Sequence, residues 1–281
     1  MKAAVDCIPC FFRQALEAAR MVTGDAVKQK FVLDALARDV SSFLMDKTPI
    51  HYAPSIYDPI KTIANHHDPF RAMKRRYNEK ALRMVALAKK EIERAPDPLL
   101  AAVRFALAGN VIDFGPNAGF DFGKEMENVQ THPFGIFDND AFRQMVRQTK
   151  SVLYLGDNAG EIVFDKMLIE TVGKPTVYIV RGEPVINDVT LEDAEFVGMK
   201  DCAEVISNGS RYPGTVLESC SDEFLSYYGS AELVVSKGQG NFETLSEETK
   251  PIVFLLKAKC TVVARHLGVE VGDFVLKKQN R

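Results

Sequence analysis

From residue 150 onward, short apolar runs alternate with helical patterns, and this alternation limits the fold more than any other feature of the chain. The runs predict strands at residues 151–155, 176–180, 204–207, 233–236 and 252–256. Between them, helical spacing of apolar residues predicts helices at 161–172, 191–197, 221–228 and 242–248. Strands that alternate with helices indicate an α/β fold with a parallel, Rossmann-like sheet and helices on both faces.

The part of the chain before residue 110 shows helical patterns only. Helices are expected at 9–21, 25–44, 55–65, 70–94 and 98–111, and the basic residues of the fourth are expected to form a solvated face. We therefore predict three regions: an all-helical part at 1–115, a connecting segment rich in glycine, proline and charge at 116–149, and the α/β part with the functional site at 150–281.

Composition argues against several classes of function. The 281 residues include 35 basic and 38 acidic residues, so a net charge of −3 does not favour nucleic acid as a partner. No apolar run reaches the roughly 20 residues that span a bilayer, so no membrane association is expected. The first residues, MKAAVDCIPC, lack the apolar core of a signal peptide, and a cytoplasmic location is the expectation. The sequence predicts no particular oligomeric state.

Polar, glycine-containing turns follow four of the predicted strands. They are Asp157-Asn158 with flanking glycines, the stretch from Arg181 to Asp188, Asn208-Gly209-Ser210, and the stretch from Lys237 to Asn241. Because parallel strands end at a common edge of the sheet, these turns are expected to meet there. Each turn alone is weak evidence, since such residues are common in turns, but four at one edge form a candidate site.

The side chains in these turns indicate a type of chemistry. Asp157, Asn158 and Asp188 offer the hard oxygen ligands that suit magnesium or manganese. Lys237 lies in a glycine-rich turn that is suited to holding a phosphate. The candidate substrate-binding set is Lys237, Gly238, Gly240, Asn241 and Arg181, with Asp157 and Lys237 as the catalytic candidates. A metal that faces a phosphate clamp favours hydrolysis of a small phosphoester, and the sequence has neither a GxxxxGK[ST] nor a GxGxxG motif.

Five cysteines are scattered through the chain, and Cys7 and Cys10 form a single CxxC pair. A structural zinc site would normally need a second ligand pair, and a thioredoxin-type motif should follow a strand. We therefore favour a structural role for this pair over a second metal site or redox chemistry. Cys260 is a candidate to approach the pair in space.

Several motifs resemble those of the damage-control phosphatases, metal-dependent phosphatases long catalogued as domain of unknown function 89. They are GDNAGE at 156–161, INDVT at 186–190, SNGSRYPGT at 207–215 and SKGQGNFETL at 236–245. The early CIPC and the late LLKAKC resemble the subgroup with an N-terminal CxxC, and the similarity extends from Cys7 to about Leu276. The resemblance implies that Asp157, Asn158 and Asp188 hold the divalent cation, and that Lys237 contacts the substrate phosphate. It also implies a helical part joined to a Rossmann-like part.

The first hypothesis is therefore a phosphatase that depends on a divalent cation (magnesium, manganese, nickel or cobalt). Its substrate would be a small phosphorylated metabolite, such as a sugar phosphate or a phosphopantetheine-like compound. The sequence leaves open whether water attacks phosphorus directly or Asp157 attacks first. Two alternatives are a carboxyl methyltransferase that uses S-adenosylmethionine and a metabolite-binding protein without catalytic activity.

Overall fold

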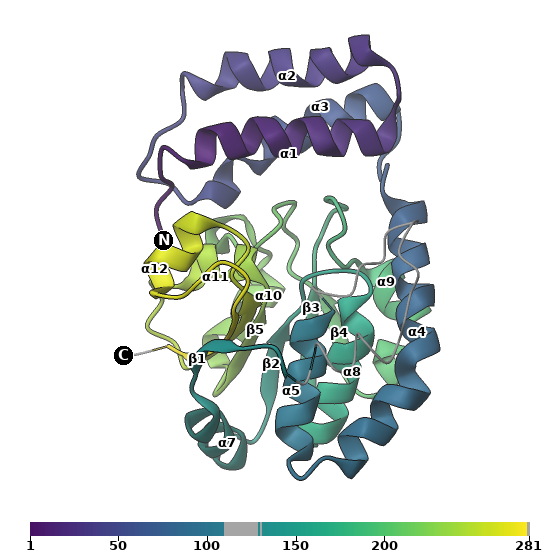
Figure 1. The fold of residues 1–281 in the computed structure, drawn as a ribbon, viewed down its shortest axis with the longest axis vertical. Helices are drawn as coiled ribbons and strands as arrows, with labels where there is room; N and C mark the ends of the chain where they lie inside the picture. Colours follow the sequence, from purple (N-terminus) through teal and green to yellow (C-terminus); the bar gives the residue numbers. More distant parts are fainter. Residues whose placement is uncertain (110–128, 130, 280–281) are drawn as a thin grey trace.

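The computed structural model describes residues 1–109, 129 and 131–279, which form one sheet with helices on both faces and a further group of helices at one end (Figure 1). The end of the predicted helical part, 110–115, and most of the predicted connection before residue 131 lie outside the described residues. The α/β fold class predicted from the sequence is confirmed.

Within the residues that the structure describes, the nine predicted helices are present with shifts at their ends, and two further helices, at Asn139–Gln148 and Thr261–Leu267, were not predicted. They are α1 (Cys7–Val22), α2 (Ala26–Val40), α3 (Ala53–Ala64), α4 (Arg71–Arg94), α5 (Pro98–Ala108), α7 (Asn139–Gln148), α8 (Glu161–Val172), α9 (Leu191–Phe196), α10 (Asp222–Ser230), α11 (Gln239–Leu245) and α12 (Thr261–Leu267), with the 3₁₀ turns η1 (Pro49–Tyr52), η2 (Met199–Asp201) and η3 (Leu217–Ser219). None of the helices in the described part of the chain is long and apolar enough to cross a membrane.

The sheet has seven strands in the order β1-β7-β6-β5-β2-β3-β4. They are β1 (Phe134–Phe137), β2 (Val152–Leu155), β3 (Thr176–Val180), β4 (Glu204–Ser207), β5 (Val234–Lys237), β6 (Ile252–Lys257) and β7 (Phe274–Lys278). All five predicted strands are present and run parallel to one another. The chain moves outward from β2 through β3 to β4 on one side, and from β5 to β6 on the other. The order of the strands therefore reverses between β2 and β5.

The expectation of a purely parallel sheet is wrong at one edge. β7 pairs antiparallel with β6, and β1 pairs parallel with β7. Neither strand was predicted: β1 alternates between half-buried and exposed residues, and β7 ends in two lysines, so neither has the continuous apolar run of a central strand. The described part of the predicted connection, 131–149, thus contains β1 and α7.

The alternation of side chains along the strands divides the core between the two faces of the sheet. Tyr154, Tyr178 and Val235 pack on the face covered by α4, α5 and α8, and Leu155, Ile179 and Phe254 pack on the face covered by α10, α11 and α12. Both faces are covered, which explains why the central strands are apolar throughout rather than alternating.

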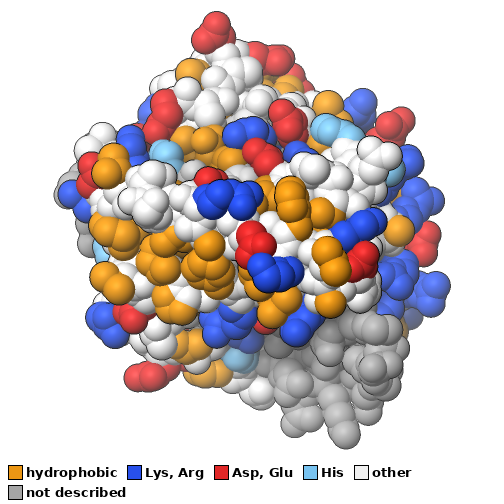
Figure 2. Space-filling model, turned by 90° about the horizontal axis from the view of Figure 1, so that it is seen from above, with side chains coloured by type: hydrophobic (Ala, Val, Ile, Leu, Met, Phe, Trp, Pro, Cys, Tyr) orange, Lys and Arg blue, Asp and Glu red, His pale blue; other side chains and the backbone are white. Residues whose placement is uncertain are grey.

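The N-terminal helices occupy two different places. α1, α2, η1 and α3, which we call the cap, share their own apolar cluster and lie at one end of the sheet (Figure 1). α4 and α5 instead pack against α8 as part of the core of the sheet, with Ala88 and Phe105 fully buried. Seen from the cap end, basic and acidic side chains are interspersed with apolar ones (Figure 2).

Two polar residues of α4 are buried, and one of them, Lys74, is contrary to the expectation that the basic residues of this helix face solvent. Lys74 is 2% exposed and pairs with Asp68 (2.9 Å) and Asp193 (3.0 Å). Asn78 is fully buried: its Nδ2 donates to Asp193 Oδ1 (3.0 Å), and its Oδ1 accepts from the Gly160 amide (2.7 Å). Asn78 therefore ties α4 to α9 and to the turn that precedes α8.

Replacing Asn78 by Leu should destabilise the protein by about 2–3 kcal/mol, because the Gly160 amide and an oxygen of Asp193 would stay buried without their partner. Urea unfolding followed by circular dichroism measures the change. Glu79→Ala, on the exposed side of the same helix turn, is the matched control and should cost less than about 0.5 kcal/mol. Equal effects of the two substitutions would contradict the bridging role of Asn78.

Candidate functional site

The candidate site lies where the strand order reverses, at the carboxyl ends of β2 and β5. In open α/β sheets a crevice forms at such a point, because the loops from the two strands turn in opposite directions. Asp157 follows β2, and Gly238 follows β5 with φ 81° and ψ 162°. A Cβ atom at Gly238 would overlap the carboxylate of Asp157. The β5 turn therefore packs directly against the first candidate ligand.

The loops after β2 and β3 are joined by main-chain hydrogen bonds. The Val189 amide donates to the Asp157 carbonyl (2.9 Å), and the Ala159 amide donates to the Asn187 carbonyl (2.8 Å). Asn158 and Asp188 thereby pair as an isolated antiparallel bridge. Two carboxylates and one carboxamide, separated by 30 residues in the sequence, are held side by side by the backbone, as predicted from the parallel strands.

Ile186, in the loop after β3, has a strained backbone. Its φ of 41° is a value that β-branched residues rarely adopt, and it costs of the order of 1–3 kcal/mol. The Asp188 amide closes this turn by donating to the Val185 carbonyl (3.0 Å). The side chain of Ile186 packs against the cap cluster. Packing against the cap thus helps to hold the turn that presents Asp188.

Arg181 contacts both candidate acids, Asp157 and Asp188, from beneath the sheet edge. It is 1% exposed, its Nε donates to Asp188 Oδ2 (2.6 Å), and its Nη2 lies 3.9 Å from Asp157 Oδ1. Among the described residues, neither Nη1 nor Nη2 has a hydrogen-bond partner. Arg181 is therefore placed to orient Asp188, and it does not line the cavity described below.

Lys237 is the last residue of β5, and its side chain contacts α8. Its side chain is fully buried, with Nζ 3.0 Å from Glu161 Oε2 and 2.9 Å from Asp165 Oδ1. Asp165 also accepts hydrogen bonds from the hydroxyls of Tyr154 (2.7 Å) and Tyr178 (2.9 Å). Lys237 is thus not an exposed turn residue, and it does not line the cavity. A direct contact between Lys237 and a phosphate stays a prediction, while the observed geometry favours a role in positioning Glu161.

Glu161 extends this network to the candidate ligands. The Asn158 amide Nδ2 donates to Glu161 Oε1 and to Asp157 Oδ2, both at 2.6 Å. The orientation of the Asn158 side chain is therefore fixed by two carboxylates.

The buried charges at this site do not balance. Four carboxylates (Asp157, Glu161, Asp165 and Asp188) are at most 6% exposed, and the two buried cations beside them are Arg181 and Lys237. The ionised site has an excess of two negative charges, which is costly to bury without a counter-ion. In agreement, burial and the charges of Glu161 and Asp188 raise the pKa of Asp157 to about 8.

A divalent cation would offset this excess, and the available donors are of the right type. Two carboxylates and an amide oxygen are hard ligands, and magnesium is commonly held by one or two carboxylates together with water and substrate oxygens. Within residues 1–109, 129 and 131–279, no group of three or more His, Cys, Asp or Glu side chains is arranged to hold a metal ion. Such a cation would therefore depend on Asp157, Asn158 and Asp188 with oxygens from water and substrate.

A cavity of about 410 Å³ opens above these residues, between the sheet edge and the cap. Its floor contains Asp157, Asn158 and Asp188, and its cap side includes Phe11, Ile56 and Tyr57. Other residues that line it include Asp6, Cys7, Cys10, Arg13, Glu17, Ile186, Gln239, Gly240, Glu243, Lys259 and Cys260. The cavity therefore combines an acidic floor, a partly apolar roof, and basic side chains from both the cap and the sheet edge.

Ion pairs connect the cap to the loops of the sheet around this cavity. They join His51 to Glu218 (3.0 Å), Lys61 to Glu183 (3.4 Å) and Arg211 to Asp58 (3.1 Å). Each pair includes at least one well-exposed partner, so each contributes little to stability. The cap is held at its rim mainly by weak polar contacts.

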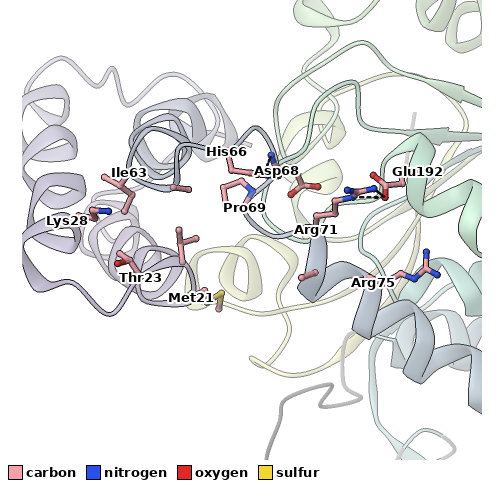
Figure 3. Close-up of a pocket in the computed structure, with 13 residues that line it drawn as sticks. Met21, Thr23, Lys28, Ile63, His66, Asp68, Pro69, Arg71, Arg75 and Glu192 are labelled. Carbon is pink, nitrogen blue, oxygen red and sulfur yellow. Dashed lines mark hydrogen bonds and ion pairs between the residues drawn. The ribbon is translucent and has the colours of Figure 1, made fainter.

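A second cavity, of about 700 Å³, is larger but less suited to chemistry (Figure 3). It lies between the end of α1, α2, α3 and the start of α4, away from the strand ends. Most of its charged residues are already paired: Arg71 with Glu192 (2.6 Å), Asp68 with Lys74, and Arg75 with Glu79. We therefore take the smaller cavity as the candidate site.

The remaining predicted residues have mixed positions. Gly240 lines the cavity, whereas the side chain of Asn241 is buried and binds the carbonyls of Gly156 (3.2 Å) and Lys237 (2.7 Å). Asn241 thus braces the turns after β2 and β5 from below. Cys7, Cys10 and Cys260 line the same cavity, and all five cysteines are free thiols. The expectation that Cys260 approaches the CxxC pair agrees with this shared wall.

No role is predicted from the sequence for Glu161, Asp165, Gln239, Glu243 or Lys259. The position of Lys259 is a usable signal, because it follows β6 at the same sheet edge as the four polar turns. Glu161 and Asp165 lie in the first two turns of α8, where the sequence pattern does not distinguish them from ordinary helix residues. No pattern in the sequence distinguishes Glu243, since its importance comes from burial.

Comparison with known proteins gives a consistent result. The family described as Damage-control phosphatase ARMT1-like domain matches residues 3–275. An uncharacterized protein of Methanocaldococcus jannaschii is 35% identical over 294 residues, covering 98% of this chain and 94% of that protein. Proteins named damage-control phosphatase are 34% identical in Pyrococcus horikoshii (98% and 97% covered) and 33% identical in Archaeoglobus fulgidus (99% and 99% covered). The crystal structure of a P. horikoshii protein of the domain of unknown function 89 family superposes with a TM-score of 0.89 at 32% identity, over 100% of both chains.

Substituting Gly238 by Ala should weaken Mn²⁺ binding by at least about 10-fold, because the new Cβ must displace Asp157. Isothermal titration calorimetry measures the affinity. Gly268→Ala is the matched control: Gly268 also has a positive φ (73°), but nothing lies within 4 Å of the added Cβ. It should lose some stability and keep the affinity. Unchanged Mn²⁺ binding in Gly238→Ala would show that the close approach does not matter.

Proposed function

Since the chain belongs to the damage-control phosphatase ARMT1-like family, we propose that it is a divalent-metal-dependent phosphatase that hydrolyses small phosphorylated metabolites. The observation that carries the proposal is the excess of two buried negative charges beneath a cavity that also contains a lysine. Such a site attracts a cation and, next to it, a phosphate.

Asp157, Asn158 and Asp188 would hold the cation, with Arg181 orienting Asp188 and Glu161 orienting Asn158. When bound, a divalent cation supplies Lewis-acid polarisation of the phosphoryl group and favours ionisation of a water molecule. The protein residues fix the ligand geometry from below, because each buried acid is tied to a neighbour by a charged or polar contact.

Lys259 is better placed than Lys237 to meet the substrate phosphate. Its side chain lines the cavity. Burial raises the pKa values of Asp157 and Asp188, and the positive charge of Lys259 partly offsets this rise at both acids. An ammonium group opposite the cation would stabilise the negative charge that develops on the phosphoryl oxygens. Arg13 of α1 also lines the cavity and supplies a second positive charge from the cap.

The size of the cavity is consistent with small phosphate monoesters. A volume of about 410 Å³ is within the range of small-molecule sites. Sugar phosphates and phosphopantetheine-like compounds both remain candidates. A screen of phosphorylated metabolites with Mg²⁺, Mn²⁺, Ni²⁺ and Co²⁺ tests the proposal directly, because neither a methyltransferase nor a metabolite-binding protein would release phosphate.

Replacing Asp157 or Asp188 by Ala should lower metal-dependent phosphate release by at least about 100-fold at saturating Mn²⁺, with the fold retained. Steady-state kinetics and circular dichroism measure the two effects. Glu183→Ala is the matched control, because Glu183 is an exposed acid on the same loop as Asp188. Wild-type rates in either aspartate variant would remove these residues from the site.

Lys259→Met should raise KM for a phosphate monoester by about 10–100-fold and leave thermal stability unchanged, because it removes one cavity charge. Lys257→Met, two residues earlier and outside the cavity, should change KM by less than about twofold. Lys237→Met should instead lower stability by about 3–5 kcal/mol, since Glu161 and Asp165 would lose their buried counter-charge. A stable Lys237→Met protein with a raised KM would restore the direct phosphate contact predicted for Lys237.

A further inference from the structure

Glu243 is a buried acid in the cavity wall whose presence the metal site does not explain. It lies on α11, is 6% exposed, and lines the same cavity as Asp157 and Lys259. Among the described residues, its carboxylate receives one hydrogen bond, from Gln239 Nε2 to Oε1 (2.8 Å). No lysine or arginine side chain in the described part of the chain forms an ion pair with it.

This sets Glu243 apart from the buried acids at the ends of β2 and β3. Asp188 has Arg181, and Glu161 and Asp165 share Lys237. The charged and titratable groups around Glu243 are the Met1 amino group, which donates to its main-chain oxygen (2.7 Å), Cys7 of α1, and Lys259 and Cys260 after β6. Burial makes the charged carboxylate costly and raises the pKa of Glu243 to about 7, although the Gln239 hydrogen bond and the positive charge of the Met1 amino group favour the ionised form.

Gln239 connects Glu243 to the loop that carries Lys259. Its Oε1 accepts from the Lys259 amide (2.9 Å), while its Nε2 donates to Glu243 Oε1 (2.8 Å). One carboxamide therefore fixes both the acid and the loop of the proposed phosphate-binding lysine. An acid in the wall of the cavity that also contains this lysine is suited to act on the ester oxygen of a bound substrate.

We propose that Glu243 is the general acid that protonates the leaving group of the phosphate monoester. This inference rests on the proposed phosphatase activity. As the bond between phosphorus and the ester oxygen breaks, the Glu243 proton moves to that oxygen, and the product leaves as a neutral alcohol. The attacking water forms the new bond to phosphorus and keeps one hydrogen. Its other proton passes to solvent, and solvent returns a proton to the Glu243 carboxylate.

The test compares leaving groups of different basicity in the isosteric variant Glu243→Gln. Glycerol phosphate has a strongly basic alkoxide leaving group, which needs a proton, whereas the p-nitrophenolate of p-nitrophenyl phosphate leaves without one. At saturating Mn²⁺, kcat for glycerol phosphate should fall by about 100-fold, in the range of general-acid catalysis, and kcat for p-nitrophenyl phosphate by less than about fivefold. Glu247→Gln, an exposed acid four residues later, is the matched control and should change neither rate.

Each outcome decides the assignment. Equal losses with both substrates, in a protein that circular dichroism shows to be folded, would make Glu243 a structural residue and overturn the proposal. A large loss of Mn²⁺ affinity by calorimetry would make it a metal ligand and also overturn it. If Glu243→Gln does not fold, Glu243→Asp keeps the acid but shortens it, and the proposal then requires a larger loss for glycerol phosphate than for p-nitrophenyl phosphate. Absence of metal-dependent phosphate release by the wild-type protein is a separate result, which would remove the proposed function itself.

Discussion

A buried excess of negative charge at the carboxyl ends of β2 and β3 is the constraint on which the site depends. Four carboxylates lie almost out of contact with solvent beside two cationic side chains. Lys237 and Arg181 each offset part of this charge from beneath the sheet edge, at contacts of 2.6–3.0 Å. They also fix the positions of the carboxylates, because a buried ion pair with further hydrogen bonds has little freedom to rearrange. What remains is a rigid, oxygen-rich surface with an unmatched charge of two, facing an enclosed cavity.

The backbone around this surface is shaped to bring the acids together. Gly238 allows the β5 turn to touch Asp157, and the strained Ile186 turn presents Asp188 while its side chain packs under the cap. The close approach at Gly238 and the strained turn at Ile186 destabilise the fold locally. The packed sheet beneath them supplies the stability that offsets this cost. The cap contributes in another way. It encloses the cavity with apolar residues and contacts the sheet loops both through apolar packing of Val185 and Ile186 and through exposed ion pairs, which individually contribute little.

The cavity wall opposite the acidic floor has a different character. Lys259 offers a positive charge, Glu243 is a buried acid without an ion pair to a lysine or arginine among the described residues, and the Gln239 carboxamide binds the Glu243 carboxylate and the Lys259 main chain. Under the proposed function, a cation on the floor and an acid in the wall would be the two components that break a phosphate ester. The cation would stabilise charge on the phosphoryl oxygens, and the acid would neutralise the leaving oxygen. Relatives named damage-control phosphatase align with this chain over nearly its whole length, and the solved structure of the Pyrococcus horikoshii protein shares its fold.

The sequence by itself determined the parallel core of the sheet and the meeting of Asp157, Asn158 and Asp188. Apolar runs that alternate with helices allow few arrangements, and parallel strands end at one edge. It did not determine β1 and β7, because their exposed residues give weak patterns. Nor did it determine that α1, α2 and α3 form a cap while α4 and α5 join the core of the sheet, because these helices differ only in what they pack against. Nor did it show that Lys237 points away from the cavity while Lys259 points into it, since both are lysines at strand ends. Burial decides such roles: a carboxyl group on the surface keeps its ordinary pKa, whereas burial raises the pKa of Glu243, and only the folded chain determines which surroundings each residue has.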